Sequence, residues 1–93
     1  MVWNFDRYGV LVQEERVGDV VTFTLKPISI AMDRWREVAG SVHEWCSPKR
    51  DQHVLCMRER VNVTVMAKLP DADVDPFIAD LKSTLEKHFQ TEG

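Results

Sequence analysis

The sequence predicts an α+β fold, a two-layer sandwich in which two helices cover one face of an antiparallel sheet of three or four strands. Two segments carry apolar residues at helical spacing, and the segments before and between them alternate apolar with polar residues. The chain has 93 residues, of which 44% are hydrophobic, so we expect a single domain over residues 1–93. The expected order of elements is ββαβ(β)α.

The first two strands are expected to form a hairpin. Residues 7–15 alternate loosely around the β-branched centre Val10-Leu11-Val12, and Val17-Gly18-Asp19 is typical of a turn. Residues 20–26 alternate cleanly, and Pro27 ends the strand because proline cannot donate to a sheet ladder. One face of this strand carries Val21, Phe23 and Leu25, and the other carries Thr22, Thr24 and Lys26.

A helix is predicted over residues 29–46, with Ser29 as its N-cap. Its apolar stripe follows spacings of four and three residues and consists of Ala31, Trp35, Val38, Val42 and Trp45. Gly40 weakens the middle of this helix by about 1 kcal/mol relative to alanine. A glycine in that position often marks a close approach to another element. Ser47-Pro48 ends the helix.

Residues 53–69 indicate strand structure, with two competing interpretations. Seven apolar residues stand at odd-numbered positions and would share one face of a single long strand: Leu55, Met57, Val61, Val63, Val65, Ala67 and Leu69. The alternative is a hairpin that turns at Arg58-Glu59-Arg60. Because that segment holds no Gly, Asn or Pro, the sequence favours the long strand, bent or bulged near Glu59.

The last helix is predicted over residues 75–89, with Pro76 in its first turn. Its stripe consists of Phe77, Ile78, Leu81, Leu85 and Phe89, and the carboxylates that suit its N-terminal end are Asp71, Asp73 and Asp75. Residues 1–7 are expected to form an N-terminal arm or an extra strand, and residues 90–93 to fray.

The segment 15–27 resembles the segment 59–70. Each begins with Glu-Arg-Val, continues with Val-Thr, and reaches Lys and then Pro before a predicted helix. The match needs gaps. It indicates either a duplicated ββα unit or only the shared composition of strands.

Composition excludes several classes of function. Twelve Lys and Arg against fifteen Asp and Glu give a net charge of −3, which lacks the basic field of a general nucleic-acid binder. No stretch approaches the ~18 apolar residues of a membrane span, and the N-terminus has no apolar signal region. Two cysteines are too few for a disulfide framework, so we expect free thiols and a cytoplasmic location.

The most specific chemical pattern is His43-x-x-Cys46 followed by His53-x-x-Cys56. Imidazole and thiolate are ligands that zinc prefers, and residues three apart on a helix share a face. On a strand, however, residues three apart point to opposite faces. One tetrahedral ion therefore takes all four only if the backbone near His53 is irregular. Zinc is an alternative to the simpler interpretation, in which the cysteines pack in the fold and no cofactor is bound.

Catalysis is not favoured by the sequence. Cys46 lies at a helix C-terminus, the wrong end of the helix dipole for a thiolate, and Cys56 has only Leu55 and Met57 beside it. The run Asp71-Ala72-Asp73-Val74-Asp75 resembles the start of a calcium loop, but Pro76 and Lys82 replace the required Gly and Glu. A small enzyme with a pocket between helices and sheet, lined by Trp35 and Trp45, is a further alternative.

We therefore expect a non-catalytic protein-interaction module that self-associates as a homodimer or binds another protein, with no nucleic acid and no membrane as partner. A domain of this size leaves much apolar surface uncovered. The candidate interface residues are Trp3 and Phe5 in the arm, Leu11 and Met66 on the sheet face away from the helices, and Arg58 and Arg60, which would lie near Glu14 or Glu15 of a second copy.

Overall fold

The computed structural model describes residues 2–3 and 8–90. Its elements are β1 (Val2–Trp3), β2 (Val10–Val17), β3 (Val20–Pro27), α1 (Met32–Cys46), the 3₁₀ helix η2 (Ser47–Gln52), β4 (Val54–Glu59), β5 (Asn62–Lys68) and α2 (Asp71–Gln90). The predictions for residues 4–7 of the arm, including Phe5, and for residues 91–93 of the tail lie outside the described residues.

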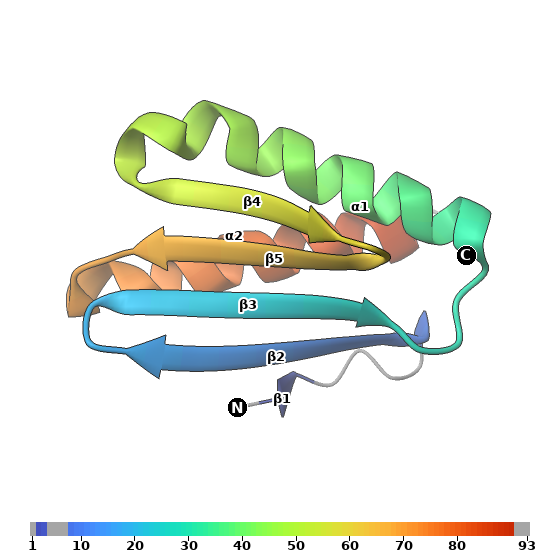
Figure 1. The fold of residues 1–93 in the computed structure, drawn as a ribbon, viewed down its shortest axis with the longest axis horizontal. Helices are drawn as coiled ribbons and strands as arrows, with labels where there is room; N and C mark the ends of the chain where they lie inside the picture. The colour runs from blue at the N-terminus through green and yellow to red at the C-terminus, as the bar shows by residue number, and fades with distance from the viewer. Residues whose placement is uncertain (1, 4–7, 91–93) are drawn as a thin grey trace.

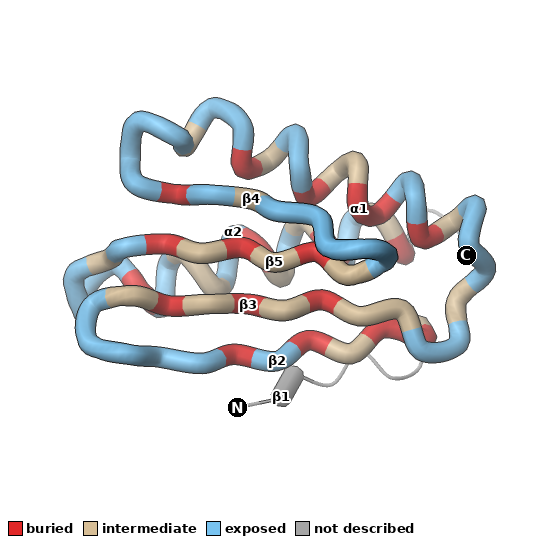
Figure 2. Tube along the Cα trace, in the orientation of Figure 1, coloured by how far each residue is buried: buried red, intermediate tan, exposed pale blue. Residues whose placement is uncertain are grey.

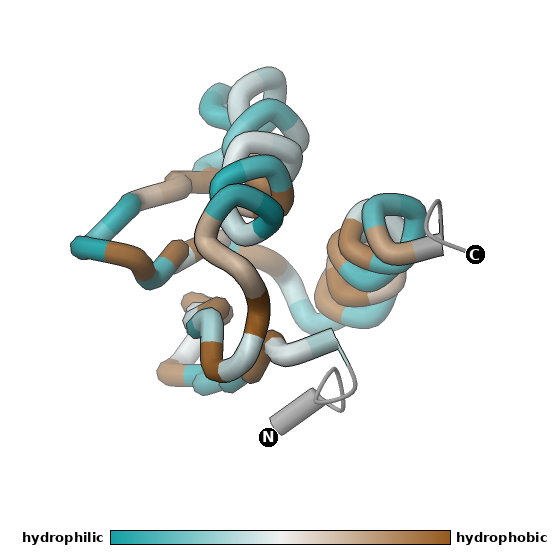
Figure 3. Tube along the Cα trace, turned by 90° about the vertical axis from the view of Figure 1, so that its right-hand side faces the viewer, coloured by the Kyte–Doolittle hydropathy of each residue, from teal (hydrophilic) through white to brown (hydrophobic). Residues whose placement is uncertain are grey.

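The strands form one antiparallel sheet in the order β1-β2-β3-β5-β4 (Figure 1). Figure 3, which looks along the strands, places α1 and α2 on the same side of the sheet. The predicted two-layer α+β architecture is therefore confirmed. No helix in the described ranges is both long and apolar enough to cross a bilayer.

The core lies between the sheet and the two helices. Buried residues alternate with more exposed ones along β3 and β5, as Figure 2 shows. At its centre Phe23 pairs with Val65 across β3 and β5, and the Phe23 ring stacks on Phe77 of α2 with 5.8 Å between ring centroids. The largest fully buried side chains are Phe23, Leu25, Leu81 and Leu85.

The favoured long strand over residues 53–69 is wrong, because this segment is the β4–β5 hairpin. Glu59 pairs with Asn62, which leaves Arg60 and Val61 as a two-residue turn. A two-residue turn pairs odd-numbered with even-numbered positions, so the odd-numbered apolar residues change face at the turn. Those of β5 face the helices, whereas Leu55 and Met57 of β4 face the other way.

Arg60 adopts the left-handed backbone conformation that this turn requires. Its φ is 60°, matching the 61° of Gly18 in the β2–β3 turn. Glycine reaches this region without cost, while a residue with a Cβ is strained there by about 1–2 kcal/mol. A tertiary contact helps to hold the strained turn: the indole Nε1 of Trp35 in α1 donates a hydrogen bond to the carbonyl of Val61.

The chain consists of two successive ββα units that meet at the β3–β5 pair. Superimposing the two turns aligns Val21-Thr22 with Val63-Thr64 and Lys26 with Lys68, which are pairs that the sequence comparison also matched. The pair Phe23 and Val65 lies at the centre of this arrangement. The Glu-Arg-Val triplets do not superimpose, because Glu15 falls on Met57, so the structure matches only part of the sequence similarity.

Both helices begin at residues other than those predicted. Ala31 occupies the N-cap of α1 and makes no side-chain capping bond. The backbone N–H groups of Ile28 and Ser29 donate to the carbonyl of Gly9, which ties this segment to the start of β2 and delays the helix. Gly9 has a φ of 76°, and a Cβ there would lie 2.6 Å from the carbonyl carbon of Ser29, so only glycine permits this approach.

The second helix, α2, begins at Asp71 rather than Asp75, so Pro76 lies inside it and not in its first turn. Proline lacks an N–H, so the helix loses the hydrogen bond to the carbonyl of Ala72. Both residues are exposed, and water can satisfy that carbonyl.

Shortening Leu81 should destabilise the protein strongly. Leu81 has no exposed surface, so Leu81→Ala should lower the free energy of unfolding by about 2–5 kcal/mol. Ile28→Ala is the control, because Ile28 is 56% exposed and lies beyond the end of β3, and truncation there should cost about 0.5 kcal/mol or less. Urea denaturation measures both values. Equal losses in the two variants would show that this side of α2 is not the core.

Candidate functional site

The candidate site lies along the boundary between α1 and the edge strand β4, which we call the α1–β4 seam. A hollow of about 250 Å³ opens between the N-terminal half of α1 and the β4–β5 turn. Next along the seam, a hollow of about 270 Å³ is lined by Gly40, His43, Glu44 and Arg58. Another, of about 80 Å³, lies beside both cysteines. Neighbouring hollows share Arg58 or His43, so they follow one another along the seam.

Helical spacing and strand alternation place these residues. Arg36, Gly40 and His43 are separated by four and three residues, so they line one edge of α1. Cys56 and Arg58 occupy alternate positions of β4, on the side that faces the helices. The two elements therefore present an arginine-rich boundary in a protein whose net charge is −3.

Two thiols and an imidazole meet near the C-terminal end of α1. Cys46, in the last turn, is 2% exposed, whereas Cys56 of β4 is half-buried. Both cysteines and His43 line the same hollow of about 80 Å³. Both cysteines are free, and Arg50 of η2 lines the same hollow.

These contacts move the two thiol pKa values in opposite directions. The hydrogen bond from Cys46 lowers the pKa of Cys56 from 9.0 to about 6, and His43 and the charge of Arg58 act in the same sense against burial. The hydrogen bond to Cys56 and then burial raise the pKa of Cys46. The sequence neighbours Leu55 and Met57 do not act on the Cys56 thiol, whereas Cys46 and His43 of α1, which are remote from it in sequence, do.

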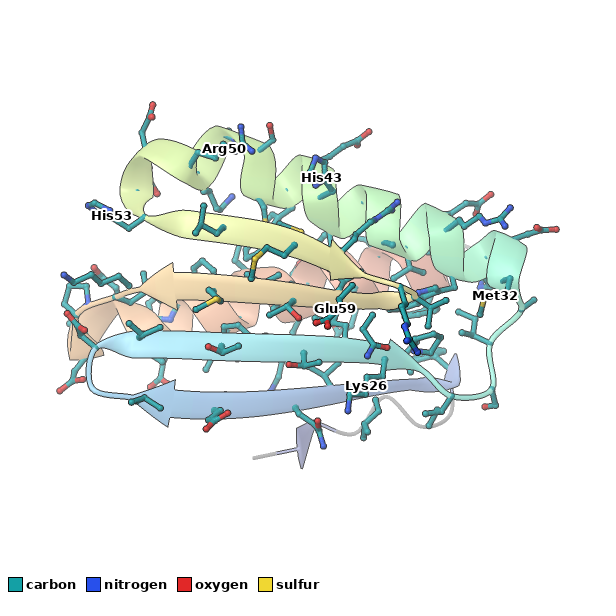
Figure 4. The ribbon with its side chains drawn as sticks, viewed as in Figure 1. Lys26, Met32, His43, Arg50, His53 and Glu59 are labelled. Carbon is teal, nitrogen blue, oxygen red and sulfur yellow. The ribbon has the colours of Figure 1, made fainter. Side chains whose placement is uncertain are left out.

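His53 does not join this cluster. It follows η2 with a left-handed φ of 62°, is exposed, and points away from the seam, while His43 projects from α1 (Figure 4). The backbone near His53 is thus irregular, yet only three of the four proposed zinc ligands come together. Among residues 2–3 and 8–90, no group of three or more His, Cys, Asp or Glu side chains is arranged to hold a metal ion. Zinc binding stays a prediction.

Arg36, Arg58 and Arg60 surround the hollow beside the β4–β5 turn. Trp35, Val61, Met32 and Ala39 supply its apolar wall. None of the three arginines forms an ion pair with another described residue. Guanidinium groups bind carboxylates and other oxyanions through paired hydrogen bonds. This part of the seam therefore suits an anionic group.

The proposed interface residues fall in different places. Leu11 and Met66 lie on the sheet face opposite the helices, as expected, whereas Arg58 and Arg60 line the seam. We call the uncovered side of β2–β5 the open sheet face; it also carries Leu55 and Met57, which sequence analysis had assigned to the same side as the β5 core residues. The side chains of Trp3 and Phe5 lie outside the described residues.

Trp35 and Trp45, which were expected to line one pocket between helices and sheet, lie in different places. Trp35 lines the hollow beside the turn. Trp45 packs against Phe77 with 5.0 Å between ring centroids and donates a 2.8 Å hydrogen bond to Asp80, so it joins α1 to α2.

Comparison of the chain with protein-family models, with curated proteins and with solved structures returns no match.

Gly40→Ala should stabilise the isolated protein. A Cβ at this position would have no atom within 4 Å, and alanine favours a helix by about 1 kcal/mol over glycine. Thermal unfolding should therefore show a higher Tm. A lower Tm would mean that the seam beside Gly40 is closed. Gly9→Ala provides the contrast and should lower the Tm, because a Cβ at Gly9 would lie 2.6 Å from the carbonyl carbon of Ser29.

Proposed function

We propose that the protein is a protein-interaction module that self-associates as a two-fold homodimer through its open sheet face. The observation that carries this proposal is the exposure of two large apolar side chains in the middle of β4, Leu55 at 54% and Met57 at 47%. Both lie on the side of the sheet that no described element covers.

The apolar side chains form a continuous centre on this face. Leu55 pairs directly with Met66, and Met66 pairs with Thr22 of β3. Met57 pairs with Thr64, which in turn pairs with Thr24. Leucine, methionine and the methyl groups of threonine present a surface that a second sheet can cover at a spacing of about 10 Å.

Charges of both signs surround this centre. Glu15 and Glu59 contribute negative charge, and Lys26 and Lys68 contribute positive charge; Figure 4 shows Lys26 and Glu59 at the same end of the sheet. An apolar centre with a charged rim is the usual anatomy of a protein interface. Because the rim carries both signs, a second copy rotated by a two-fold axis offers each charge a partner, which favours a homodimer.

Charges placed in the centre of the face should abolish the dimer. Sedimentation velocity at tens of micromolar should show a dimer for the unaltered chain and a monomer for the double variant Leu55→Glu, Met57→Glu. Both side chains are half exposed, so the variant should keep its circular dichroism spectrum and cooperative melting.

The matched control is Ile28→Glu, because Ile28 is 56% exposed but lies beyond the end of β3. This variant should remain dimeric. The proposal fails if the unaltered chain is a monomer at this concentration, or if Ile28→Glu dissociates the dimer as fully as the double variant does.

A further inference from the structure

We propose that Cys56 is a thiol–disulfide exchange site for anionic, low-molecular-weight disulfides, and that Cys46 resolves the mixed disulfide into an intramolecular Cys46–Cys56 bond. Both cysteines line one hollow of about 80 Å³ although they come from different elements, α1 and β4. A disulfide requires the sulfurs to approach to about 2.05 Å. Because both thiols border the same small space, this approach needs only a local adjustment of α1 against β4.

The difference in exposure between the two cysteines indicates which thiol attacks the external disulfide and which resolves the mixed disulfide. Cys56 is half-buried and lines an open hollow, so a small disulfide can reach its sulfur. Cys46 is 2% exposed, so an external disulfide cannot reach it directly. An accessible attacking thiol beside a second, protected thiol is the arrangement that thiol–disulfide exchange uses.

The charge of the seam selects the class of disulfide. Arg50 and His43 line the hollow that contains Cys56, and Arg58 lies one alternate position along β4. Glu44 is the acidic side chain that lines the adjoining hollow, and Lys49 of η2 acts on Cys46. Basic groups outnumber the acid, so a disulfide bearing carboxylates should be attracted and one bearing ammonium groups repelled.

The chemistry balances in two steps. The Cys56 thiolate attacks one sulfur of the small disulfide; a Cys56–sulfur bond forms, the original disulfide breaks, and one small thiolate leaves and takes up a proton. Cys46 then loses its proton to solvent and attacks the Cys56 sulfur, and the second small thiolate leaves. The two protein thiols are oxidised by two electrons in total, and the small disulfide is reduced to two thiols.

The test treats the full chain with glutathione disulfide, which is anionic, or cystamine, which is cationic, at equal concentration. Intact-mass spectrometry and peptide mapping follow the products. The unaltered chain should lose two hydrogens and contain a Cys46–Cys56 bond. Cys46→Ala should instead accumulate one glutathionyl group on Cys56, and Cys56→Ala should not react under native conditions. Circular dichroism checks that both variants are folded.

Two variants with the same change of charge test whether the seam favours anionic over cationic disulfides. Arg58→Glu should lower the rate with glutathione disulfide relative to cystamine by on the order of tenfold. Lys87→Glu, which makes the same charge change on exposed surface of α2, should leave this ratio unchanged. Cys56 faces the helices and not the open sheet face, so these measurements do not depend on self-association.

Several results would overturn the proposal. Absence of exchange in the folded chain would refute the site, as would a mixed disulfide on Cys46 or a Cys56–Cys56 bond between two chains in place of the intramolecular bond. Equal or faster reaction of the unaltered chain with cystamine would refute the anionic class.

Discussion

The two-residue turn at Arg60 and Val61 is the constraint on which both proposed surfaces, the open sheet face and the α1–β4 seam, depend. By pairing Glu59 with Asn62 it sets the register of β4 against β5, and that register decides which side each β4 residue faces. A shift of one residue would move Cys56 to the open sheet face and Leu55 into the core. The strained turn persists because Trp35 of α1 binds the Val61 carbonyl, so helix packing and strand register support each other.

The two ββα units place comparable groups at equivalent positions. When the turns are superimposed, Glu14 corresponds to Cys56, and Arg16 corresponds to Arg58. In the first unit the buried Glu14 carboxylate accepts a 2.9 Å ion-paired hydrogen bond from Arg16 Nε. In the second unit the charge of Arg58 favours the thiolate of Cys56. Each unit thus places an arginine two residues after a titratable side chain, and in the second unit that side chain is the thiol that we propose for disulfide exchange.

The spacing of the apolar residues was sufficient to predict the two layers. The alternation along a strand and the stripe on a helix can each be recognised within a single segment of the sequence. The first hairpin could also be predicted, since Gly18 supplies its left-handed turn. The second could not, because Arg60 occupies the equivalent position and its support comes from Trp35, which is distant in sequence. The same limit applies to the site: His43, Cys46 and Cys56 could be singled out, but the hydrogen bonds that distinguish the two thiols exist only when α1 packs beside β4.

Gly40 bears on the proposal that the seam is a binding surface. A glycine in a helix often marks a point where another segment approaches too closely for a Cβ, and Gly9, in the turn before β2, makes such an approach to Ser29. At Gly40 no described atom would meet a Cβ, so within the chain the glycine weakens α1 without relieving a clash. It does leave room between α1 and Arg58, where a hollow connects the arginines at the turn with the thiols at the end of α1. Open space, guanidinium groups that form no ion pair with another described residue, and a half-buried thiol therefore lie along one seam, on the opposite side of β4 from the face proposed to bind a second copy.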